Sequence, residues 1–301
     1  MKIRTTLLII IFNLLIVSAA FPQDKEPSVY FKLYGGYGLF TPGSDRLYPG
    51  SILGIQSGST GTYTNSNRGL GGGFNDGFGI EKTLGKFFTI GIDFNYLHGK
   101  TLSSNYSIVP PASFNIANIN YAGKTAHSVI SLIPNLSFKM MTKPNYYLYT
   151  RLGLITALKT KYQLTENYDI AGNGLLGSDE VFTQVNKYGL NFGLNTAAGI
   201  RFKLWGPIKG NVELGYNLLA VSPNSAMAST NIAEPGQGTY INEQINYVKS
   251  NTDLLNLSTT TTTQNSIKTI NVVEDQPSIT QHINNIVLNI GIAVSITDLR
   301  R

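Results

Sequence analysis

A strict two-residue alternation of side-chain character constrains this chain more than any other feature. Across 188–204 the even positions are mostly apolar or aromatic, and the odd positions are small, amidic or basic. The same period fits 88–96. A β-strand places successive side chains on opposite faces, whereas a helix would need a period of 3.6 residues, which fits neither segment. Both segments are therefore predicted to be strands with one apolar and one polar face.

Eight segments carry this pattern, and the lengths of their connections alternate. The segments are 28–40, 70–83, 87–98, 127–140, 146–158, 188–204, 210–221 and 284–297. In the second segment Asp76 falls on the apolar face, which indicates a bulge or an error of phase there. Short turn sequences follow the second, fourth and sixth segments. The other connections are long: 41–69, 99–126, 159–187 and 222–283.

Composition favours a membrane barrel over a soluble β-sandwich. The chain is 42% hydrophobic and only 13% charged, and it has 17 Tyr, 14 Phe and 31 Gly. The polar faces of the predicted strands hold mainly Gly, Asn and Ser with isolated charges. In a soluble sandwich the polar face of each strand points outward and carries many charged residues that meet water. The segments also exceed the usual strand length of about five or six residues. We predict an all-β, antiparallel up-and-down transmembrane barrel of about eight strands, or of ten if 222–283 hides two.

The first twenty residues have the character of a secretory signal. Lys2 and Arg4 precede the apolar run 7–17, and small residues at 18–20 predict cleavage after Ala20. This assigns 1–20 to the signal peptide and 21–301 to the barrel domain. An even strand count then predicts a protein of the outer membrane with periplasmic termini and turns and with extracellular long loops.

Several segments resemble a known group of proteins. The stretch IPNLSF at 133–138, the stretch YLYTRLG at 147–153, the final alternating strand and the signal peptide resemble the outer-membrane β-barrel family typified by the eight-stranded barrel of outer-membrane protein A, in its Bacteroidota-type porin-like form. The resemblance implies two kinds of partner, namely outer-membrane lipids and the barrel-assembly machinery during insertion. The chain departs from the family at its end, DLRR, which lacks the terminal aromatic residue common there.

Little in the sequence points to catalysis, and no catalytic, metal or cofactor site is expected. The absence of Cys excludes disulfides and zinc-thiolate sites. His98, His127 and His282 fall near the loop ends of strands, and no acidic residue adjoins His127 to orient its ring as a triad requires. The G-x-G-x-x-G match at 172–177 lacks a βαβ context and is read as a flexible loop. Basic residues form no run, so nucleic acid is not expected as a partner.

Four charged residues are predicted to meet inside the barrel. If Leu204 faces Gly210 across the sixth hairpin, Arg201 faces Glu213 on the polar side of both strands. Asp93 and Arg151 have the same parity and would point into the same lumen. We therefore expect a lumen charge network of Arg201, Glu213, Asp93 and Arg151.

These features together predict an integral outer-membrane barrel without catalysis and with a structural, adhesive or envelope-assembly role. A protein partner, extracellular or in the envelope, would bind the long loops. The Thr tract at 259–263 is expected to be part of a mobile loop. Two alternatives stay open: a narrow porin-like channel, and a lipid-modifying enzyme that uses His127 at the barrel rim.

Overall fold

The computed structural model describes residues 29–41, 60–65, 70–109, 116–172, 178–234, 237–248, 257–264, 267–277 and 280–296. The proposed signal peptide lies outside these residues. No helix within the described ranges is long and apolar enough to cross a lipid bilayer.

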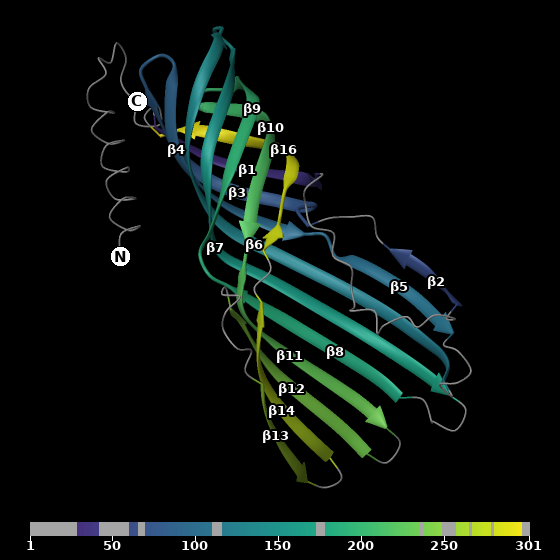
Figure 1. Ribbon diagram of the computed structural model, residues 1–301. Helices are drawn as coiled ribbons and strands as arrows, with labels where there is room; N and C mark the ends of the chain where they lie inside the picture. Colours follow the sequence, from purple (N-terminus) through teal and green to yellow (C-terminus); the bar gives the residue numbers. More distant parts are fainter. Residues whose placement is uncertain are drawn as a thin grey trace.

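Eight strands close into an antiparallel barrel (Figure 1). They are β1 (Val29–Phe40), β3 (Gly73–Leu84), β4 (Phe88–Gly99), β6 (Ile116–Thr142), β7 (Tyr146–Gly172), β9 (Asn191–Trp205), β10 (Ile208–Val221) and β16 (Asn285–Ser295). Neighbours pair in this order, and β16 closes the barrel against β1. The predicted all-β up-and-down barrel is confirmed, since each of the eight predicted segments overlaps one barrel strand. Of the described strands within 222–283, only the two-residue strand Gln281–His282 pairs with the wall, at the end of β10, and it adds no wall strand, so the ten-stranded alternative is wrong.

The sequence suggested that the four long connections are loops, but each of them contains strands. They contribute β2 (Thr60–Asn65), β5 (Leu102–Val109), β8 (Ser178–Tyr188), β11 (Pro223–Glu234), β12 (Gln237–Val248), β13 (Leu257–Gln264), β14 (Ile267–Pro277) and β15 (Gln281–His282). The Thr tract lies on β13 rather than in a mobile loop. Only Gly172 of the glycine-rich match is described, and it ends β7.

The sheet continues beyond the barrel because β6 and β7 are 27 residues long and extend past its rim (Figure 1). Beyond the rim, the N-terminal half of β6 pairs with β5, and the C-terminal half of β7 pairs with β8. The strand order of this part of the sheet, which we call the extension, is β2-β5-β6-β7-β8-β11-β12-β14-β13. Thr, Asn and Ser dominate many of its strands. Such polar residues suggest loops in a sequence, yet Thr is enriched in strands because its branched side chain fits a pleated surface.

The polarity of the sheet inverts where it leaves the barrel. The outward-facing even positions of β6 run from polar Asn118, Asn120 and Lys124 to apolar residues beginning at Ile130. On β7, Leu158 is the extra residue of a bulge opposite Ile130, and this bulge exchanges the faces of the residues that follow. On β6 and β7 the outer face of the extension is therefore mainly polar, whereas the outer face of the barrel is apolar.

Two residues of the barrel wall, Asp76 and Pro134, are unusual for a strand at their positions. Asp76 is exposed on the outer face, and β3 shows no bulge near it, so the suspected irregularity is absent. Pro134 lacks an N–H group, and the ladder between β6 and β7 is interrupted at 133–134. The side-chain amide of Asn135 donates to the carbonyl oxygen of Ile133 at 3.0 Å, which satisfies a group beside the interruption.

Candidate functional site: the barrel lumen

Six charged side chains form a continuous ion-pair chain across the middle of the lumen. Its order is Arg201, Glu81, Lys32, Asp93, Arg151 and Glu213. The five N···O distances lie between 2.6 and 3.2 Å, and each side chain is at most 5% exposed. Three cations and three anions make the chain neutral. Tyr149 extends it by donating its hydroxyl to Glu213 at 3.1 Å.

The register of the sixth hairpin differs from the one assumed from the sequence. Arg201 faces Asn211, and Glu213 faces Gly199, so these two charges are not direct cross-strand neighbours. The hairpin closes through Gly206 and Pro207 and has a register irregularity at 208–209. Gly206 adopts a φ of +51°, a conformation that short hairpin turns require and glycine tolerates. The resulting shift of two residues keeps both charges on the inner face but changes their neighbours.

Ion pairs instead form between strands, several of them not adjacent in the barrel. Arg201 Nη1 contacts Glu81 Oε2 at 2.7 Å, although the residues are 120 apart in sequence. Arg151 joins Asp93 and Glu213, at 2.6 Å to each. All four residues expected in the lumen thus lie in one ion-pair chain, which also includes Lys32 and Glu81. Parity places these two residues inward as well, but their partners follow only from the closure of the barrel.

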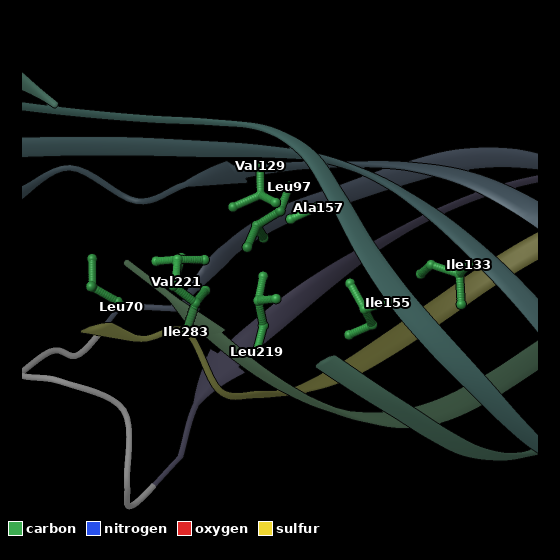
Figure 2. Packing of buried hydrophobic residues seen from close by; sticks show 9 residues of the cluster. All are labelled: Leu70, Leu97, Val129, Ile133, Ile155, Ala157, Leu219, Val221 and Ile283. Carbon is green, nitrogen blue, oxygen red and sulfur yellow. The ribbon is translucent and has the colours of Figure 1, made fainter. Parts of the chain in front are cut away.

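Between this ion-pair chain and the extension, an asparagine layer and then an apolar plug occupy the lumen. Asn95 donates to the Tyr34 hydroxyl at 3.2 Å, and Asn75 donates to Asn289 at 3.1 Å. The plug is a cluster of nine buried residues, which Figure 2 shows between the strands: Leu70, Leu97, Val129, Ile133, Ile155, Ala157, Leu219, Val221 and Ile283. A cavity of about 20 Å³ remains between the two layers, room for about one water molecule. At these levels the described side chains therefore fill most of the lumen.

Tyrosine rings and lysines occupy the lumen toward the turn end of the barrel. Lys209 Nζ lies 4.6 Å from the ring centroid of Tyr30 and donates to its hydroxyl at 2.7 Å. Lys139 lies 5.2 Å from the Tyr147 ring, and the guanidinium of Arg201 is 5.9 Å from the same ring. The ring quadrupole attracts a cation over an aromatic face, so these tyrosine rings offset part of the cost of burying the cations.

His98 and His127 have different surroundings in the described part of the chain. His127 is buried and accepts a hydrogen bond from the backbone N–H of Gly71 at 3.4 Å. His98 is exposed, and its ring nitrogen lies 3.4 Å from the Tyr96 hydroxyl. Among described residues there is no group of three or more His, Cys, Asp or Glu that could hold a metal ion.

The inner face of the extension continues the barrel lining with a different chemistry. Tyr121 and Tyr162 are buried on it, and Glu166 accepts hydroxyl hydrogen bonds from Tyr121 at 2.8 Å and from Tyr168 at 3.2 Å. On β12 burial raises the pKa of Glu243 to about 7, assisted by repulsion from, and a hydrogen bond with, Glu274 on β14. Protons can therefore bind here near neutral pH.

Comparison of the chain with protein-family models and with curated proteins finds no match. The class that the fold defines is thus a closed, eight-stranded antiparallel barrel that carries a large sheet beyond one rim.

Proposed function

We propose that the protein is an integral outer-membrane barrel that anchors an extracellular β-sheet, with a structural, adhesive or envelope-assembly role and without catalysis. In this proposal the apolar outer wall of the barrel contacts lipid. The turns and both termini lie in the periplasm, and the extension lies outside the cell.

A belt of exposed apolar side chains around the barrel carries this proposal. Every wall strand contributes to it, and one residue from each is between 42 and 62% exposed: Leu33, Ile80, Ile92, Leu136, Leu152, Leu194, Leu214 and Ile290. The inner positions of the same strands hold the buried charges and asparagines. Water would disfavour so large an apolar surface, whereas lipid matches an apolar exterior around a polar interior.

The ends of the belt support the proposed membrane insertion. Exposed aromatic residues lie near both ends of the barrel: Phe87, Phe88, Phe138, Tyr146 and Trp205 at the turn end, and Tyr37, Phe74 and Tyr96 toward the extension. Aromatic rings favour the membrane–water interface. At the other end the outer face of β6 becomes polar, as expected for a strand that emerges into water.

The filled lumen favours an anchor over a pore. An eight-stranded barrel has an interior just wide enough for its own side chains, and here an ion-pair chain and an apolar plug occupy it. The narrow channel therefore remains the weaker candidate. The enzyme alternative has less support, because no carboxylate is described within hydrogen-bonding distance of His127.

Single cysteines test the topology in a chain that has none of its own. On intact cells, an impermeant thiol reagent should label Thr261→Cys on β13 but not Lys143→Cys in the turn after β6. Permeabilised cells should label both, which controls for accessibility. Labelling of Lys143→Cys alone on intact cells would invert the orientation, and failure of the wild type to float with outer-membrane lipid would reject membrane insertion.

A further inference from the structure

In the described part of the chain the extension has two free edges, β2 and β13, at opposite sides of the sheet (Figure 1). Among the described strands, β2 pairs only with β5 and β13 only with β14. All eight side chains of β13 are exposed. Each edge therefore presents a row of backbone N–H and C=O groups that can accept another strand.

Neither edge carries the usual protection against strand addition. The edge sequences are TGTYTN and LSTTTTTQ, which contain no charged residue and no proline. Proteins commonly protect exposed edges with lysine, proline or a bulge. The β13 ladder also runs without a register shift from Leu257 to Gln264, so no bulge twists this edge away.

Strand direction decides which edges can meet. If strands running away from the barrel are called outward, β7 is outward and β6 is inward. Following the pairings across the sheet makes β2 inward and β13 outward. The parallel pairing of β12 with β14 produces this result, since nine strictly alternating strands would leave both edges running the same way.

We propose that the occupant of the β13 edge is the β2 edge of a second copy of this chain. Two copies standing side by side in one membrane present an outward β13 to an inward β2, so they pair antiparallel and continue one sheet. Antiparallel pairing of two β13 strands would instead require one copy to be inverted, as in a facing membrane. The inference rests on the proposed membrane anchorage, which fixes the relative orientation of the copies.

The contact joins two different surfaces and therefore propagates. A heterologous contact builds rings or open rows rather than a closed pair. Each added copy keeps its tyrosine-lined face on the same side, so the extensions form a continuous wall above the membrane. Such a wall fits the structural or envelope-assembly role better than an isolated anchor does.

Cysteine pairs in cells that express two tagged populations test this contact. One population carries Thr260→Cys or Thr262→Cys on β13, and the other carries Thr60→Cys, Thr62→Cys or Thr64→Cys on β2. A short bifunctional maleimide should crosslink one tag to the other for a subset of these pairs. Thr262→Cys with Gln244→Cys on the interior strand β12 should not crosslink, which controls for random collision.

Lysine at the edge should abolish the crosslink. Adding Ser258→Lys to the β13 cysteine variant places a charge on the edge, whereas Gln244→Lys adds the same charge to interior strand β12 and should leave the crosslink intact. Dimers from Thr262→Cys alone would show β13 self-pairing and overturn the proposal, as would the absence of any β13–β2 crosslink. Flotation of the same samples with membrane lipid reads the anchorage separately, so its failure is distinguishable from failure of the edge contact.

Discussion

Each charge in the lumen is held in place by its neighbours. Asp93 is fully buried and contacts Lys32 at 2.9 Å and Arg151 at 2.6 Å. Gly79 leaves space beside it, because a Cβ there would collide with the Asp93 carboxylate. Buried ions lose hydration that only close partners replace, so a neutral chain of charges is stable where a single charge would not be.

Glu213→Gln should therefore destabilise the barrel. The substitution leaves Arg151 sharing Asp93 with Lys32, and uncompensated buried charge of this kind costs about 3–5 kcal/mol of the free energy of unfolding. Tyr149→Phe, which removes only one hydroxyl from Glu213, should cost about 1 kcal/mol. Unfolding of the wild type and both variants from lipid vesicles measures the difference. Equal, small losses in the two variants would mean that water reaches Glu213.

Among the elements, β6 is the strand whose outward side chains change from polar to apolar, where we propose that the protein passes from water into lipid. Leu136 and Ala126 both point outward and are both exposed, but they lie on opposite sides of the polarity change. Leu136→Arg should cost about 2–4 kcal/mol in a bilayer, as charge does on the lipid face of such barrels. Ala126→Arg should change stability by about 0.5 kcal/mol or less, as at an ordinary surface position. Equal costs in vesicle unfolding would place both residues in the same environment.

The neighbouring strands β12 and β14 make the stability of the extension depend on pH. Burial and Glu274 raise the pKa of Glu243 to about 7, so the folded state holds a proton that the unfolded chain releases at lower pH. The contribution to stability is therefore greatest below the ordinary Glu pKa and falls as pH rises toward about 7. Hydrogen exchange in β12 and β14, corrected for intrinsic rates, should show more protection at pH 5 than at pH 8.

Glu243→Gln should remove this pH dependence and raise protection at pH 8, because the amide cannot ionise. Amides of β16 in the barrel should not respond to the substitution, and they act as the internal control. Unchanged pH dependence in the variant would assign the effect to another group.

For the whole molecule, the filled lumen predicts a barrier to ions. The wild type in planar bilayers should be nearly closed, because the plug and the ion-pair chain block the path in series. Glu213→Gln should raise the open probability by loosening that chain. A large, steady wild-type conductance that the substitution leaves unchanged would contradict the filled lumen and favour the narrow channel.

The sequence by itself determined the barrel wall and the direction of its side chains. Alternation with a period of two is local, so it placed Asp93, Arg151, Arg201 and Glu213 on one face without knowledge of their partners. It also placed Leu194 and Ile290 on the opposite face, where both are at least half exposed.

Only the tertiary structure decided which inward charges touch and what the long connections form. Arg201 contacts Glu81 because barrel closure brings β9 and β3 across one lumen, and a bulge near Gly206 sets the register of the sixth hairpin. The extension depends on β6 and β7 continuing as a template past the rim, and on a parallel pairing of β12 with β14. Turn geometry, bulges and hydrogen bonds between distant strands fix such pairings, and they leave little trace in the local pattern of residues.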